Sequence, residues 1–216
     1  MANHLDLEEQ EQLDQLKHFW KRYGNLITWL LIAVLGSLAA WNGYQWWNKR
    51  QAEQASAMFD EVERVISGGD VVAAERAFSD MKQRFPSTVY AQQAGLTLAR
   101  VAYISGKPEV AQNALAWVAE SSADAGLAAV AKIRHAGLLL ESKSFESAMK
   151  LLEGSFPAEF AGLVADKKGD AMLAQNKPEQ AIAFFREAYK QLPEREQYRR
   201  LVEVKLASLG VAASAN

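Results

Sequence analysis

The chain has 216 residues, a formal net charge of −2 and no cysteine. The lack of cysteine excludes thiol nucleophiles and thiolate metal sites, and it fits an oxidising compartment without requiring one. No block of basic residues is large enough to follow a phosphate backbone, so we expect no nucleic-acid partner.

The first 24 residues predict a short leader, which carries five acidic and three basic side chains. Leu13, Leu16, Trp20 and Tyr23 recur at helical spacing within it. Such an apolar stripe can lie in the interface of a lipid bilayer. We therefore expect the leader to end against a membrane surface.

A charge-free run follows the leader and occupies residues 23–48. Lys21-Arg22 precede it and Lys49-Arg50 follow it. Because an α-helix rises about 1.5 Å per residue, roughly 20 apolar residues cross a hydrocarbon core of about 30 Å. Aromatic residues gather at both ends, as they do at membrane interfaces. The sequence predicts a transmembrane signal-anchor helix over residues 25–47.

Three further properties of this helix can be inferred. A cleaved signal peptide, with processing after Ala39, is the less favoured alternative because the leader is long and acidic and the apolar run continues beyond that site. The bases close to the span outnumber those after it only slightly. The bases that precede the span favour a cytoplasmic leader and a domain outside the cytoplasm. Small residues at Gly36, Ala40 and Gly43 form a face on which a neighbouring helix could pack.

Residues 48–209 predict a domain built from helices, because alanine is frequent and apolar residues recur every three or four positions. Interruptions typical of helix–helix turns divide it. They occur at residues 67–70, 85–87, 105–108, 142–144, 176–178 and 192–193.

The same domain contains an internal repeat. GKPEVAQNAL, KSFESAMKLL and NKPEQAIAFF align on one small residue, and GDVVAAERAF precedes them at a similar spacing. This pattern resembles the tetratricopeptide repeat, in which small residues mark the places where paired helices touch. An irregular bundle with accidental periodicity is the alternative. The residues predicted to pack between helices are Ala74, Ala99, Ala111, Ala136, Ala148, Gly169 and Ala181.

The predicted fold is therefore all-α, with one N-terminal transmembrane helix followed by a tetratricopeptide-like helical-repeat solenoid. The segment EREQYRRLVEVKLASL is amphipathic and suits the capping element that a solenoid needs at its end. Residues 210–216 predict a frayed tail.

The sequence offers little for catalysis. It has three histidines, at positions 4, 18 and 135, and none is paired at a metal-ligand spacing. It contains no glycine-rich phosphate loop and no nucleophile elbow. We expect no enzymatic activity and no cofactor. Asp166, Asp170 and Glu179 are spread along a repeat, as solvated charges usually are.

A binding surface is the remaining possibility. Solenoids of paired helices form a groove from the first helix of each unit, and peptides commonly bind there. Several of the corresponding positions are apolar, so burial between neighbouring repeats is an equal alternative. The predicted groove residues are Gln93, Leu96, Arg100, Tyr103, Ile133, Leu163, Asp166 and Asp170.

The order of these features resembles one family. LDQLKHFWKRYGNLI, the Gly- and Trp-rich span, RQAEQASAMFDEV and above all KKGDAMLAQNKPEQA are similar to the YfgM-type ancillary subunits of the Sec translocon. The resemblance implies a bacterial inner-membrane protein with its repeat domain in the periplasm. It also implies association with SecYEG and with a membrane-anchored periplasmic chaperone of the prolyl-isomerase class. A general membrane-anchored scaffold for envelope assembly or cell division is the alternative function.

Overall fold

The computed structural model describes residues 7–194 and 197–213. Every regular element in these ranges is helical, which confirms the predicted all-α fold. The chain divides into two compact units, Met1–Gln51 and Ala52–Asn216. Helix α1 (Leu7–Ser67) begins in the first unit and ends in the second.

In the first unit, many apolar side chains of α1 are exposed. Leu26, Trp29 and Leu30 are each more than half exposed. The helix is long and apolar enough to cross a membrane, with a mean hydropathy of 1.7 over its most apolar window. These side chains need a non-aqueous environment, because leaving them in water forfeits the free energy of their burial.

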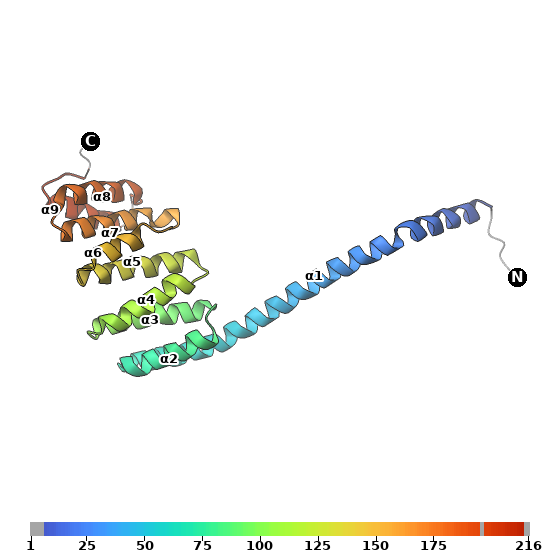
Figure 1. Ribbon diagram of the computed structural model, residues 1–216, viewed down its shortest axis with the longest axis horizontal. Helices are drawn as coiled ribbons and strands as arrows, with labels where there is room; N and C mark the ends of the chain where they lie inside the picture. The colour runs from blue at the N-terminus through green and yellow to red at the C-terminus, as the bar shows by residue number, and fades with distance from the viewer. Residues whose placement is uncertain (1–6, 195–196, 214–216) are drawn as a thin grey trace. The chain divides into compact units, whose positions relative to one another are not determined.

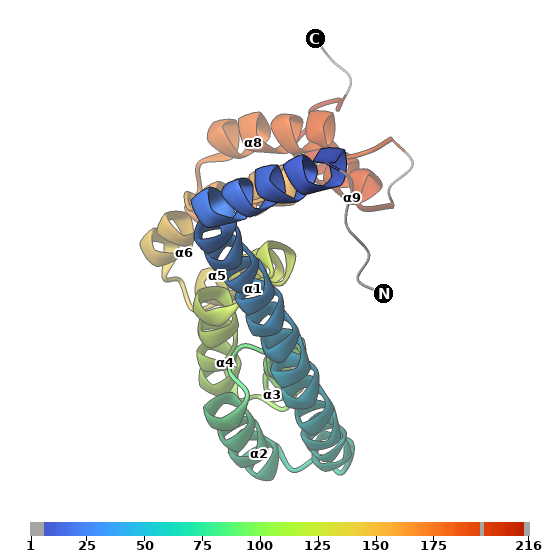
Figure 2. The same cartoon turned by 90° about the vertical axis from the view of Figure 1, so that its right-hand side faces the viewer.

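The second unit is a stack of helices that follow one another from α2 to α9 in both views (Figures 1 and 2). Within it α3 packs on α4, α5 on α6 and α7 on α8, and each pair also contacts the next. The helices are α2 (Val71–Arg84), α3 (Val89–Ile104), α4 (Pro108–Ser121), α5 (Ala125–Glu141), α6 (Phe145–Leu152), the short 3₁₀ helix η1 (Ala158–Phe160), α7 (Ala161–Ala174), α8 (Pro178–Gln191) and α9 (Gln197–Ser208).

The repeat is visible in the backbone itself. A residue with left-handed φ follows the first helix of each pair, and these residues are spaced by 37, 37, 33 and 34 positions. This conformation ends a helix by satisfying its last carbonyl groups. Because the fifth of these residues follows α9, that helix stands where the first helix of a further unit would stand. The residues are Gly69, Gly106, Lys143, Asn176 and Gly210.

The start of each helix also follows from local chemistry. Asp70, Thr88 and Asp124 accept hydrogen bonds from backbone N–H groups of the first turns of α2, α3 and α5. Pro108 and Pro178 open α4 and α8, where their missing N–H is not needed. All six predicted turns separate helices, and two further turns that were not predicted lie at residues 122–124 and 153–157. A Ser-Ser-Ala-Asp-Ala-Gly stretch would have indicated the first of them.

Small residues lie where helices approach most closely. The six alanines predicted to pack between helices are at most 4% exposed. A Cβ atom added to Gly169 would lie 2.4 Å from Phe185 Cε1, and one added to Gly95 would lie 2.6 Å from Val118 Cγ2. Such distances are far shorter than carbon–carbon contact. Gly95 was not among the predicted contact points, although it stands one helical turn before Ala99.

Candidate protein-binding groove

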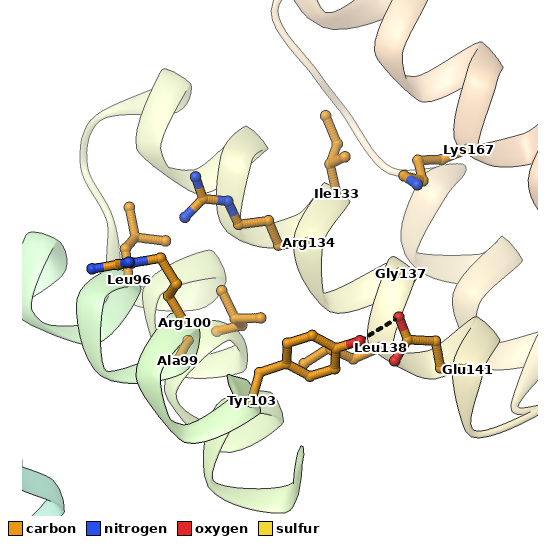
Figure 3. Close-up of a pocket in the computed structure, with 11 residues that line it drawn as sticks. Leu96, Ala99, Arg100, Tyr103, Ile133, Arg134, Gly137, Leu138, Glu141 and Lys167 are labelled. Atoms are coloured by element: carbon orange, nitrogen blue, oxygen red, sulfur yellow. Dashed lines mark hydrogen bonds between the residues drawn. The ribbon is translucent and has the colours of Figure 1, made fainter. Parts of the chain in front are cut away.

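A pocket of about 400 Å³ lies between α3 and α5, the first helices of two consecutive units (Figure 3). Its floor and sides are mostly apolar. Leu115 and Leu138 are buried, whereas Leu96 and Ile133 are only half-buried and so remain available to a ligand. The other lining residues are Ala99, Arg100, Tyr103, Arg134, Gly137, Glu141 and Lys167.

The rim of the pocket is polar and its charges are unevenly distributed. Arg100 and Arg134 are exposed, and neither has an ion-pair partner among residues 7–194 and 197–213. Figure 3 shows both guanidinium groups extending toward the same side. At the other end the Tyr103 hydroxyl donates a hydrogen bond to Glu141 Oε1 at 3.0 Å. That bond and the negative charge of Glu141 raise the pKa of Tyr103 above its usual value.

Gly137 explains why α5 leaves this space open. A Cβ atom added to Gly137 would meet no other atom within 4 Å. In the repeat register Gly137 follows Ala136 directly, as Arg100 follows Ala99 and Asp170 follows Gly169. The position therefore faces the junction between first helices in each unit, and only α5 places a glycine there. A glycine in a helix interior costs about 0.5–1 kcal/mol relative to alanine, so the open space is not free of energetic cost.

The corresponding junction between α7 and α9 is closed. Asp166 is fully buried there, and its carboxylate accepts a 2.7 Å hydrogen bond from the Tyr198 hydroxyl. Lys205 Nζ lies 2.8 Å from both Asp166 carboxylate oxygens and 2.6 Å from Asp170 Oδ1. Lys167 pairs with the other oxygen of Asp170 at 3.0 Å. Burial, followed by the bond to Asp166 and the nearby carboxylates, raises the pKa of Tyr198 strongly.

Comparison with known proteins identifies the family. The model of the tetratricopeptide repeat-like domain family matches residues 17–211. A protein of Neisseria gonorrhoeae named "Ancillary SecYEG translocon subunit" is 32% identical over 97% of this chain and 100% of its own length. The chain belongs to this family of tetratricopeptide-like ancillary translocon subunits.

Other members are more distant. The protein of the same name from Haemophilus influenzae is 28% identical over 81% of this chain and 89% of its own length. The Escherichia coli protein is 27% identical over 77% of this chain and 80% of its own length. No solved structure shows significant similarity to the chain. The repeat resemblance and the suggested family are thus confirmed, and the apolar helix fits the inner-membrane location that the family implies.

Two of the predicted groove residues lie at the closed junction between α7 and α9, and not in the pocket. Asp166 and Asp170 were expected to be solvated and to line the groove, which is wrong. Asp166 is fully buried and bonded to Tyr198 and Lys205 of α9. Asp170 is only a quarter exposed, and both Lys205 and Lys167 bind it. A buried carboxylate is stable only with partners of this kind. Lys205 lies 39 residues from Asp166 and 35 residues from Asp170 along the chain, so local spacing gave no sign of these ion pairs.

The remaining predicted groove residues divide into two groups. Leu96, Arg100, Tyr103 and Ile133 line the pocket. Gln93 is exposed but lies outside the lining, and Leu163 packs against the core that α8 and α9 form, which was the stated alternative. Three polar lining residues were not predicted: Arg134, Glu141 and Lys167. Arg134 and Glu141 lie three and four residues from Gly137, so helical spacing could have suggested these two.

The structure adds little to a catalytic interpretation. His135 is half-buried, and burial lowers its pKa despite the opposing charge of Glu120. His18 is exposed on α1, and His4 lies outside the described residues. Within the described parts of the chain, no group of three or more His, Asp or Glu side chains is placed to hold a metal ion.

The small-residue face of α1 is exposed. Gly36, Ala40 and Gly43 are exposed, and a Cβ atom added at either glycine would meet nothing within 4 Å. At Gly24, by contrast, the Trp20 ring covers the backbone, at 3.1 Å from such an atom. Gly36 and Gly43 therefore do not serve packing within the described chain.

Proposed function

We propose that this protein is a non-catalytic ancillary subunit of the SecYEG translocon, anchored by α1 and binding a protein partner with the pocket between α3 and α5. The observation that carries the binding role is the pocket itself, which joins half-buried apolar side chains to two arginines that lack ion-pair partners among the described residues. The printed name of the curated relatives supports the translocon.

We place the leader in the cytoplasm and the domain of residues 48–209 in the periplasm. Lys17, Lys21 and Arg22 stand before the apolar run, against Lys49 and Arg50 after it. Basic residues close to a span favour the cytoplasmic side. Because the leader is long and acidic and the apolar run continues beyond Ala39, we propose that residues 25–47 are an uncleaved anchor.

We further propose that the partner is a membrane-anchored periplasmic chaperone of the prolyl-isomerase class and that exported chains pass from the translocon to it. Two weak contacts, one in the bilayer and one at the pocket, give a combined affinity well above either alone. Gly36, Ala40 and Gly43 would supply the first contact to the channel, because small residues allow helices to approach closely.

Topology can be tested by single-cysteine labelling, because the natural chain contains no cysteine. Ala207→Cys places a thiol at an exposed position of α9. We expect a membrane-impermeant thiol reagent to label it in intact spheroplasts, and to label Gln15→Cys, at an exposed position of the leader, only after lysis. Protection of the Ala207 site, or a mature chain beginning near Ala40, would contradict the proposal.

Association can be tested by purification of the full chain in mild detergent. Photo-crosslinkers at Gly36 and at Tyr103 report the membrane face and the pocket, and one at exposed Asn113 of α4 is the control. We expect Gly36 to crosslink to the channel and Tyr103 to the chaperone. Co-purification without a crosslink from either site would place the contacts elsewhere. Capture of division or envelope-assembly proteins in place of SecYEG would favour the scaffold function.

A further inference from the structure

We infer that the occupant of the pocket is an acidic segment of a partner protein, which inserts one large apolar side chain between α3 and α5 and presents a neighbouring carboxylate to Arg100 and Arg134. The inference rests on the proposed function, because it assumes that this pocket binds the partner. The inference specifies which side chains the bound segment carries and how the segment is oriented in the pocket.

The floor of the pocket selects an apolar group. Leu96, Ala99, Leu115, Ile133 and Leu138 leave a volume of about 400 Å³. Pockets of this size hold compact ligands whose apolar part is largely buried. Because Gly137 has no side chain, the opening reaches the backbone of α5. A leucine or phenylalanine side chain can therefore enter between the two helices, whereas a charged side chain would lose its hydration there.

The arginines select the charge beside that group. Both guanidinium groups extend toward the same side of the pocket (Figure 3), and no ion pair holds either of them within the described residues. Guanidinium forms paired, charge-assisted hydrogen bonds with carboxylates. At the opposite end Glu141 accepts the Tyr103 hydroxyl, and the third cation of the lining, Lys167, is already paired with Asp170 at 3.0 Å. The distribution of charge therefore orients the segment, with its carboxylate at the arginine side.

In the junction between α7 and α9, the later helix itself fills the space that α5 leaves open beside α3. There Tyr198 and Lys205 of α9 enter and meet Asp166 and Asp170 of α7. In the repeat register, Leu96 and Arg100 of α3 take the places of these two aspartates. At these two positions α3 therefore presents an apolar and a basic side chain, whereas α7 presents two acidic ones. The side chains complementary to it are apolar and acidic.

The test uses the full chain in detergent micelles and two fluorescent peptides. One peptide has a phenylalanine followed by two glutamates, and its counterpart has two lysines in their place. We expect the glutamate peptide to bind at least about tenfold more tightly, a difference of about 1.4 kcal/mol. Equal binding of the two peptides, or a dissociation constant weaker than about 1 mM for the glutamate peptide, overturns the inference.

Variants identify the site. Arg100→Glu combined with Arg134→Glu should weaken the glutamate peptide about tenfold and strengthen the lysine peptide. Arg76→Glu changes the same charge at an exposed position of α2 and should alter neither. A double variant that leaves the preference for glutamate unchanged overturns the inference. Circular dichroism checks that the variants remain helical, and the wild-type comparison of peptides requires no variant.

The failure of this inference can be separated from failure of the proposed function. Gly137→Trp should fill the pocket and block any occupant. If it abolishes co-purification of the partner while the arginine reversals do not, the pocket binds the partner but the acidic segment is wrong. If it leaves co-purification intact, both proposals fail. Loss of co-purification in Gly137→Trp and in the double arginine variant, but not in Arg76→Glu, supports both.

Discussion

The α3–α5 and α7–α9 junctions occupy equivalent places in the repeat and yet differ in polarity, burial and pairing of their side chains. The first is an open apolar pocket with two exposed arginines, and the second is filled by a buried carboxylate with a lysine and a tyrosine bound to it. The backbone is not the cause, because each of these first helices ends at the same left-handed position. The side chains that enter the junction decide whether it is a binding site or part of the core.

The difference has an energetic explanation. Asp166 has lost all contact with water, so its charge is stable only while its partners stay in place. The arginines of the pocket are solvated and need no partner for stability. Substitutions at the closed junction should therefore destabilise it, whereas substitutions at the open junction should cost little or no stability.

The largest effect is expected from removal of the buried cation. Lys205→Met leaves the Asp166 carboxylate with only the Tyr198 hydroxyl, and should destabilise α9 by about 3 kcal/mol, since breaking a buried pair leaves an uncompensated charge. Arg100→Met, at the open junction, should change stability by less than about 0.5 kcal/mol. Hydrogen exchange of the full chain, followed by mass spectrometry, measures both. Equal protection of α9 in the two variants would remove the proposed contrast.

Two glycines at adjacent positions of the repeat register allow the same substitution with effects of opposite sign. Gly169→Ala places a methyl group against the buried Phe185 ring and should cost about 1–3 kcal/mol by overpacking. Gly137→Ala enters open space and should stabilise α5 by about 0.5–1 kcal/mol, because alanine favours the helix. Thermal unfolding in detergent reports both changes. A loss of stability in Gly137→Ala would mean that the pocket is not open in solution.

Two tyrosines allow the same substitution at both junctions. Tyr198→Phe removes a hydrogen bond to a buried carboxylate and should cost about 1.5–3 kcal/mol, as bonds to charged groups do. Tyr103→Phe removes an exposed bond to Glu141 and should leave stability unchanged. Denaturant titration of both variants tests the pair. Equal destabilisation would show that the pocket rim is as structural as the closed junction.

The smallest expected effect is a dependence on alkaline pH. The pKa of Tyr198 is raised in the folded chain above its usual value of about 10. The folded state therefore holds this proton more tightly, and stability falls as the pH rises above about 10. The loss should be smaller in Tyr198→Phe than in the natural chain. Tyrosinate absorbance should show Tyr198 ionising after the exposed tyrosines, and simultaneous ionisation would contradict its burial.

Features that depend on neighbouring residues could be predicted from the sequence, whereas contacts between residues far apart along the chain could not. Helix starts at Asp70 and Pro178, and the small residues of the repeat, are local signals with a direct steric or hydrogen-bonding cause. The turn before Asp124 carried such a signal and was overlooked. The repeat register also places equivalent positions of successive units on one face. This is why four pocket residues could be predicted from the sequence: Leu96, Arg100, Tyr103 and Ile133.

The sequence by itself determined the charge-free span, the helical repeat and its family, because each depends on spacing along the chain. Only the tertiary structure decided which faces are open. Asp166 and Asp170 read as solvated charges until α9 brings Lys205 and Tyr198 against them from more than thirty residues away. Gly137 likewise reads as one more small residue, and only the packing around it shows that its missing side chain leaves a pocket and not a contact. Burial is a property of all the elements that surround a residue, which is why local pattern could not supply it.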